Sequence, residues 1–179
     1  MESRIRKCKK CGREFKQFNS LQNVCGAKCA KELKDEKKAA KKDTPKTDRQ
    51  ILILKAQAAF NAFIRERDKG QPCICCGKPL GVNYHCGHFY SSGGHSNVRF
   101  NEDNAHGQRA ECNTTHRAGM LGEYSERLEK KIGAAAFEVL RADAYEPKKW
   151  EVRELEGIIK EYKQKLKELQ EERKEIKND

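Results

Sequence analysis

The sequence predicts an α+β protein made of small cores that are joined by solvated helices. Charged residues make up 36% of the 179 residues and hydrophobic residues also only 36%, which is too few for one deep apolar core. The nine cysteines include several close pairs, which are typical of small domains stabilised by a bound metal. A heptad-like repeat near the C-terminus adds a long helix.

The charge balance indicates a polyanionic partner. With 38 Lys and Arg against 27 Asp and Glu, the net charge is +11, and so basic a surface attracts nucleic acid through counterion release. A basic protein without such a partner is the simpler alternative. The longest aliphatic run, residues 51–54, is too short to span a bilayer, and the N-terminus has no apolar targeting segment, so we expect a cytoplasmic protein with no membrane partner. In that reducing compartment the cysteines favour zinc over disulfides.

Four cysteines in residues 1–35 predict a zinc finger with four thiolate ligands. Cys8 and Cys11 are separated by two residues, and Cys25 and Cys29 by three. Each pair can place two thiolates on one ion, and the two pairs together complete a tetrahedral site. Four free buried thiols would need an apolar core, which this Lys-rich segment lacks.

Residues 36–70 predict a charged linker followed by an amphipathic helix. The Lys-rich run up to Lys46 predicts a helix that fades into a solvated linker, and Pro45 ends it. Apolar side chains then recur on one helical face, at Ile53, Ala56, Phe60, Phe63 and Ile64. Gly70 and Pro72 mark the end of this helix, and we expect its apolar face to pack on the residues that follow.

The last segment, residues 146–179, predicts a long helix. Apolar side chains form a seam along one face, at Leu155, Ile159, Tyr162, Leu166, Leu169 and Ile176. Such a seam either binds a second chain as a coiled coil or packs back on its own domain, and the sequence leaves both open.

A second metal site is expected in residues 71–145. Its expected ligands are a close pair of cysteines and a second pair on one helical face, which are Cys73, Cys76, Cys112 and His116. Three residues before Cys112, where a second close cysteine pair would begin, the chain has Arg109. Cys75 and Cys86 are therefore alternative fourth ligands.

Between these ligands, the stretch from His85 to His116 carries all five histidines of the chain. A histidine, then an asparagine, then a metal-binding His or Asn at a helix start is the order that a one-metal nuclease site needs. In that order His88 acts as the general base toward water, Asn104 fixes the loop, and Asn113 holds a divalent ion at the scissile phosphate. The alternative is a zinc-finger loop in which these side chains only cap turns.

Three strings of this sequence, "CICCGKPL", "HCGHFYSSGGHSNVRFNEDNAHGQ" and "CNTTHRAG", resemble the NinG (Rap) family of phage recombination proteins. The likeness extends from the four-cysteine segment through "AFNAFIRERDKG" to "GEYSERLEKKIG". Members of this family resemble HNH endonucleases, which are also called ββα-metal nucleases, and act on branched DNA. The resemblance implies a zinc-stabilised, HNH-like core in residues 71–145 with flanking helices.

The resemblance also implies roles for single residues. His88 matches the HNH general base, Asn104 the loop-fixing asparagine and Asn113 the third position. Family members often have Asp or His at the position of His85, so His85 is expected as a second ligand of the catalytic ion. Arg109 stands where family members usually have a cysteine, and this chain carries one extra residue between Asn113 and the next histidine.

The expected function is metal-dependent cleavage of branched recombination intermediates, such as Holliday junctions or D-loops. Zn²⁺ is the expected structural ion and Mg²⁺ or Mn²⁺ the catalytic one, with Arg99 and Arg109 as phosphate contacts. Further expected partners are other recombination proteins and a second copy of the chain through the C-terminal helix. Two alternatives stay open, a non-catalytic zinc-finger protein that binds or anneals DNA, and an adaptor whose C-terminal seam recruits other proteins.

Overall fold

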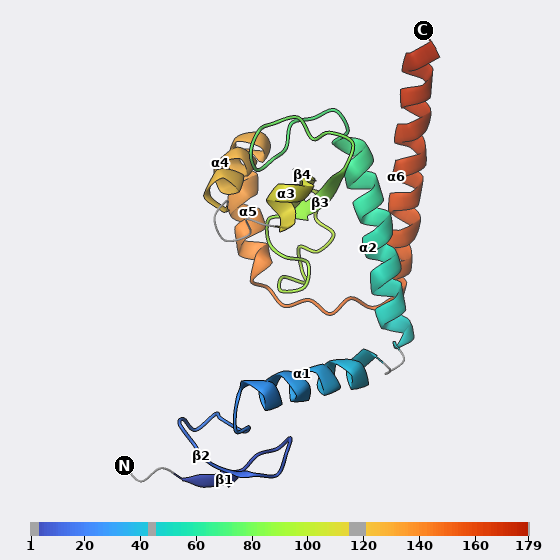
Figure 1. Cartoon of the computed structure of the whole chain (residues 1–179). Helices are drawn as coiled ribbons and strands as arrows, with labels where there is room; N and C mark the ends of the chain where they lie inside the picture. Colours follow the sequence, from blue (N-terminus) through green and yellow to red (C-terminus); the bar gives the residue numbers. More distant parts are fainter. Residues whose placement is uncertain (1–3, 43–45, 115–120, 179) are drawn as a thin grey trace. The chain divides into compact units, whose positions relative to one another are not determined.

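The computed structural model describes residues 4–42, 46–114 and 121–178. They belong to two compact units, one within residues 1–47 and one within 48–179, each with a two-stranded antiparallel sheet (Figure 1). The mixture of helices and small sheets is the one that the sequence predicts. None of the helices in the described ranges is long and apolar enough to cross a lipid bilayer.

The first unit is a small hairpin followed by a helix. Strand β1 (Ile5–Lys7) pairs antiparallel with β2 (Glu14–Lys16). Helix α1 (Ala27–Lys42) begins just before Cys29, so the second cysteine pair spans the start of this helix. The helix continues through residue 35, where we expected the finger to end. The Lys-rich run is therefore helical for most of its length.

The second unit is built on two helices that pack along each other. Helix α2 (Asp48–Arg67) lies beside α6 (Val152–Asn178) (Figure 1). The buried residues of their shared core are Ala56, Phe60, Phe63, Ile64, Phe100, Ala105, Leu155 and Tyr162. This confirms the apolar stripe expected on α2. Of the two alternatives for the C-terminal seam, the structure shows packing on its own unit as far as Leu169, while Ile176 is 76% exposed.

A second hairpin and a short helix lie in the middle of this unit. Strand β3 (Tyr84–His88) pairs antiparallel with β4 (Ala105–Arg109), and helix α3 (Ala110–Thr114) follows β4 directly. The long connection between the two strands ends in a 3-10 helix, Glu102–Asn104. The candidate site residues between His85 and Asn113 therefore lie on one hairpin, its connecting loop and the helix that follows it.

Helices α4 (Leu121–Ile132) and α5 (Ala134–Ala144) cover the side of the hairpin opposite α2 (Figure 1). They pack on a second core, whose buried residues include Ile74, Leu80, Val98, Tyr124, Leu128, Phe137 and Leu140. The hydroxyl of Tyr124 donates to the carbonyl oxygen of Gly87 at 3.0 Å, which ties α4 to β3. Two small cores thus hold the hairpin from both sides.

A buried ion pair fastens the end of α2 to the hairpin. Arg67 donates to both carboxylate oxygens of Asp68, at 2.8 and 3.0 Å, and Asp68 is 3% exposed. Asp68 also accepts a hydrogen bond from the backbone N–H of Gly107, at 2.6 Å, in the middle of β4. Although burial raises the pKa of Asp68, the neighbouring His106 and Arg67 hold it well below its usual range. The carboxylate therefore stays charged and anchors β4.

Candidate functional site

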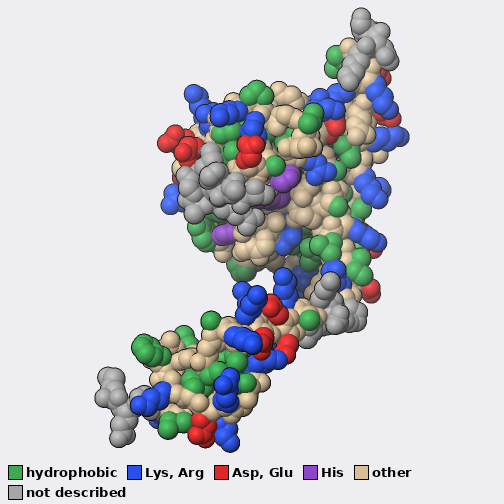
Figure 2. All heavy atoms as spheres, in the orientation of Figure 1, with side chains coloured by type: hydrophobic (Ala, Val, Ile, Leu, Met, Phe, Trp, Pro, Cys, Tyr) green, Lys and Arg blue, Asp and Glu red, His purple; other side chains and the backbone are tan. Residues whose placement is uncertain are grey.

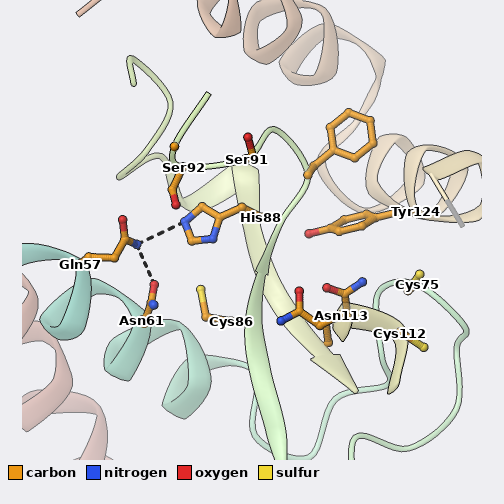
Figure 3. A pocket seen from close by; sticks show the side chains of 13 residues that line it. Gln57, Asn61, Cys75, Cys86, His88, Ser91, Ser92, Cys112, Asn113 and Tyr124 are labelled. Carbon is orange, nitrogen blue, oxygen red and sulfur yellow. Dashed lines mark hydrogen bonds between the residues drawn. The ribbon is translucent and has the colours of Figure 1, made fainter. Parts of the chain in front are cut away.

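A pocket of about 590 Å³ opens where α2, β3, α3 and α4 meet (Figure 3). Polar side chains and cysteines form most of its wall, and they are Gln57, Asn61, Cys75, Cys86, His88, Ser91, Ser92, Gln108, Cys112, Asn113 and Tyr124. Two residues for which the sequence predicts a catalytic role, His88 and Asn113, therefore line one pocket. His85 and Asn104 lie outside this lining and are described below.

His88 is the last residue of β3, and its ring faces α2 (Figure 3). Its Nε2 lies 3.2 Å from the carbonyl oxygen of Arg99. The donor Gln57 Nε2 is further away, at 3.4 Å, so the shorter contact decides the tautomer: because a carbonyl only accepts, it favours the neutral ring that donates from Nε2 and keeps Nδ1 as the basic nitrogen. Burial lowers the pKa of His88, against the opposing effect of the Arg99 and Cys86 backbone. A neutral and oriented imidazole is what a general base requires.

Two polar residues of α2 hold this arrangement and were not among the candidates from the sequence. Gln57 Nε2 donates to Asn61 Oδ1 at 2.8 Å, and Arg99 Nη1 donates to Gln57 Oε1 at 3.2 Å. Gln57 Nε2 also lies 3.4 Å from His88 Nε2. A signal was present in the sequence, because polar residues four positions apart share a helix face, and this face also carries the buried Phe60.

Asn104 closes the loop between the two strands. Its Oδ1 accepts from the backbone N–H of Tyr90 at 2.8 Å, and its Nδ2 donates to the carbonyl oxygens of Tyr90 and Val98, both at 2.9 Å. The Asn104 residue is completely buried. The loop that carries Arg99 is therefore held at both of its ends by one side chain.

Asn113 and His85 meet at the edge of the pocket. Nδ2 of Asn113, on α3, lies 3.0 Å from Nδ1 of His85, on β3. Two adjacent ligands of an octahedral Mg²⁺ ion are also about 3 Å apart. A half-turn of the Asn113 amide exchanges its nitrogen for the oxygen that a hard cation prefers. The two side chains therefore fit as ligands of one divalent ion.

The four cysteines of the first unit lie within reach of one ion. The sulfur atoms of Cys8, Cys11, Cys25 and Cys29 are all within 4.8 Å of one another. Gly12, with φ of 73°, closes the turn after Cys11, and its N–H donates to the Cys8 carbonyl at 3.0 Å. Backbone N–H groups, that of Cys11 foremost, lower the pKa of the Cys8 thiol to about 6, which favours the metal-binding thiolate.

The second unit repeats this turn. Gly77 has φ of 71°, and its N–H donates to the Cys73 carbonyl at 2.9 Å. The sulfur atoms of Cys73, Cys76 and Cys112 lie within 4.8 Å of one another. The Arg109 N–H donates to the Cys73 sulfur at 3.3 Å, as the Cys25 N–H does to the Cys8 sulfur at 3.3 Å. Arg109 thus occupies the place of a fourth cysteine, and three sulfurs are arranged as in the first cluster.

Three of the expected ligands of the second metal site are therefore together, and both sulfur clusters could hold a metal ion such as zinc. The fourth expected ligand, His116, lies outside the described residues. Its alternatives, Cys75 and Cys86, are not members of the sulfur cluster formed by the described residues. Burial raises the pKa of Cys86 to about 12, and this thiol lies in the wall of the pocket instead.

Two other histidines make contacts that serve the fold. His106 is 3% exposed, with Nε2 3.1 Å from the Asp103 carbonyl oxygen and Nδ1 3.0 Å from Arg67 Nη2. His95 Nδ1 lies 2.8 Å from the carbonyl oxygen of Ala144, at the end of α5. These contacts hold the loop and β4 in place.

The two arginines expected to contact phosphate lie in different surroundings. Arg99 is half-buried beside His88, where its guanidinium donates to Gln57. Arg109 donates to Glu111 at 2.9 Å and to the carbonyl oxygen of Pro79 at 3.2 Å, next to the second sulfur cluster. Arg99 therefore lies close to His88, whereas Arg109 packs on the turn of the second sulfur cluster.

The chain matches one known protein family over most of its length. Residues 32–172 match the family described as Bacteriophage Lambda NinG protein. The chain belongs to the NinG family. It is 39% identical over 127 residues to Protein ninG of Salmonella phage P22 and to that of Escherichia phage lambda. Protein ninG of Escherichia phage 933W is 38% identical over the same length, and each alignment covers 71% of this chain.

The NinG match contains every residue that lines the pocket, but it begins after the four cysteines of the first unit. The chain spans 62% of the P22 relative and 61% of the lambda relative. What the complete NinG relatives do is therefore carried to this chain only as a proposal. No solved structure matches this chain.

Proposed function

We propose that this NinG family member is a metal-dependent DNA endonuclease of the HNH type that cuts branched DNA during phage recombination. The observation that carries the proposal is that His88 and Asn113 line one pocket, with His85 in contact with Asn113 at its edge. The proposed general base, His88, and the proposed ligands of a divalent ion, His85 and Asn113, are then on the same hairpin and helix, and the cationic side chain of Arg99 lies next to His88. The order of elements, hairpin then helix, also suits a ββα-metal motif.

In the proposed reaction, His88 Nδ1 takes a proton from water while the water oxygen attacks the phosphorus atom. The bond from phosphorus to the 3′ oxygen breaks as the new bond forms, which leaves a 5′-phosphate and a 3′-alkoxide that takes a proton from solvent water to become a hydroxyl. His85 and Asn113 would hold a Mg²⁺ or Mn²⁺ ion, which would supply Lewis-acid stabilisation of the leaving oxygen. The Arg99 carbonyl orients the His88 ring, and the Arg99 guanidinium contacts a phosphate oxygen.

DNA as the substrate is supported by the net charge of +11. The preference for branched DNA rests only on the resemblance to the NinG family, whose members act on branched DNA. Other recombination proteins stay proposed partners, and so does a second copy of the chain. A second copy would contact faces of α6 other than its seam, because the seam packs on α2 as far as Leu169.

The deciding experiment incubates the full chain with Mn²⁺ and end-labelled DNA in three forms, a four-way junction, a flap and a linear duplex. We expect nicks that need the ion and are faster on the branched forms. Asn113→Ala should nick slowly and recover partly when the ion concentration is raised, because a weakened site fills by mass action. Binding of all three DNAs without any nicking would favour the non-catalytic DNA-binding alternative.

A further inference from the structure

The positive charge of the chain is concentrated in its first unit. Residues 1–47 hold 15 Lys and Arg against 6 Asp and Glu, a net charge of +9, whereas residues 48–179 hold 23 against 21, a net charge of +2. Figure 2 shows Lys and Arg side chains spread over the hairpin and α1. The unit that contains the pocket is thus nearly neutral. Attraction of DNA is therefore expected to come mainly from the first unit.

The first unit also exposes apolar side chains next to these charges. Phe18 is 97% exposed and Leu21 is 84% exposed. Both lie in the loop between β2 and the second cysteine pair, and residues 17–22 of this loop are called the finger tip here. Two exposed basic residues flank the tip. Lys16 directly precedes it in the sequence, and Arg4 lies beside its first residue, because the Gln17 N–H donates to the Arg4 carbonyl at 2.9 Å.

Hydrogen bonds within the loop hold the finger tip in one conformation. The N–H of Phe18 donates to Gln22 Oε1 at 2.8 Å, and Gln17 Nε2 donates to the Gln22 carbonyl at 3.2 Å. The N–H of Leu21 donates to Asn19 Oδ1 at 3.0 Å. The polar side chains of the loop thus satisfy its own backbone, and the apolar side chains of Phe18 and Leu21 point to solvent.

We propose that the finger tip recognises DNA branch points by stacking Phe18, with Leu21 beside it, on unstacked bases. Bases at a branch have lost a stacking neighbour, and an exposed aromatic ring can replace it. The basic residues around the tip contact the phosphates on either side. A continuous duplex offers no unstacked base, so the tip distinguishes a branch from a duplex. The inference rests on the proposed function in that DNA is the substrate.

The test measures DNA affinity of the full chain in a His88→Ala background, which keeps the DNA uncut. Phe18→Ala is compared with the conservative Phe18→Trp and with Ile5→Ala, a matched control because Ile5 is 66% exposed on β1 of the same unit. Zinc content verifies that each variant keeps its fold. The DNAs are a four-way junction and a linear duplex, and a 2-aminopurine base at the branch reports stacking through its fluorescence.

We expect Phe18→Ala to weaken junction binding about tenfold, as loss of one stacking contact does, and duplex binding by less than about twofold. Phe18→Trp should restore junction binding and the quenching of 2-aminopurine, and Ile5→Ala should change neither. Equal losses on both DNAs, or no loss on either, would overturn the role of the tip. The role of the tip would also be overturned if Phe18→Ala left DNA affinity unchanged and altered only the self-association of the protein, measured by sedimentation. Failure of the parent protein to bind any DNA would instead overturn the proposed function.

Discussion

Asn104 and Tyr90 are joined in both directions, since the Asn104 side chain accepts from the Tyr90 N–H at 2.8 Å and donates to the Tyr90 carbonyl at 2.9 Å. Asn104→Ala would leave the partly buried N–H and carbonyl of Tyr90 without these partners, at about 1–3 kcal/mol each, whereas the Val98 carbonyl would keep the N–H of Asn101 at 3.2 Å. We expect the free energy of unfolding to fall by about 3 kcal/mol or more in chemical denaturation, and cleavage to fall with it.

The matched control for that change is Asn101→Ala. The Asn101 side chain only accepts from the N–H of Asp103, at 2.8 Å, at the start of the 3-10 helix. Loss of such a cap costs about 1 kcal/mol. Equal destabilisation by the two substitutions would show that the loop does not depend on Asn104.

Replacement of the proposed base should separate chemistry from folding. His88→Ala is expected to slow cleavage by about two to four orders of magnitude while DNA affinity changes little, because the ring acts on water. His95→Ala is the control, since His95 lies in the same loop but contacts the end of α5. A His88→Ala protein that cuts DNA at the parent rate would exclude His88 as the base.

The cleavage rate should depend on pH through the neutral form of His88. A base works only when deprotonated, so kcat/KM should rise with pH and then level off. Burial lowers the pKa of His88 below its ordinary value of 6.5, and the midpoint of the rise should lie below that pH. The measurement is the cleavage rate of a four-way junction between pH 5 and 8 at saturating Mn²⁺. A midpoint above pH 6.5 would count against His88 as the general base.

Two neighbouring cysteines should behave differently in metal analysis. Cys76 belongs to the second sulfur cluster and Cys75 does not. Cys76→Ser should therefore lose the zinc of the second unit and lower its melting temperature, because metal binding contributes to the folded state. Cys75→Ser should keep that zinc. The zinc content of both purified variants decides the matter, and equal zinc loss would contradict the assigned ligands.

The Arg67–Asp68 pair should make stability depend on pH. Since the pKa of Asp68 is lowered in the folded state, its contribution is present above the unfolded value of about 3.9 and is lost as pH falls below it. Asp68→Asn should cost about 3 kcal/mol at pH 7, and its difference from the parent should shrink below pH 4. The exposed Glu111→Gln should cost less than about 1 kcal/mol. A pH-independent difference would argue against the ion pair.

Sequence periodicity and spacing predicted the parts of this fold that local chemistry decides. The apolar stripe of α2 and the paired cysteines of the two sulfur clusters could be read along the chain. The clustering of three cysteines in the second unit was also foreseeable. Each of these features depends on residues that are near one another in sequence or that share a helical face.

Contacts between distant elements were harder to predict. Nothing in the periodicity of α2 indicated that Gln57 would reach Arg99, or that Asp68 would bind the N–H of Gly107. Such pairings depend on how α2 packs against the hairpin. The hydrophobic pattern predicts which residues of α2 are buried, but it does not predict which residues they contact. The partner of the C-terminal seam was likewise not predictable from the sequence, because it depends on the packing of α6 on α2.

Cys112 and Asn113 are consecutive residues of α3, yet Cys112 belongs to the sulfur cluster and Asn113 to the proposed catalytic site. A structural ion on Cys112 would therefore restrict where Asn113 can lie. Occupancy of one site should then raise affinity at the other, and such a coupling is reciprocal. We expect a chelator that removes zinc to leave a protein whose Mn²⁺ requirement has increased, so that the two metals act as cooperative effectors.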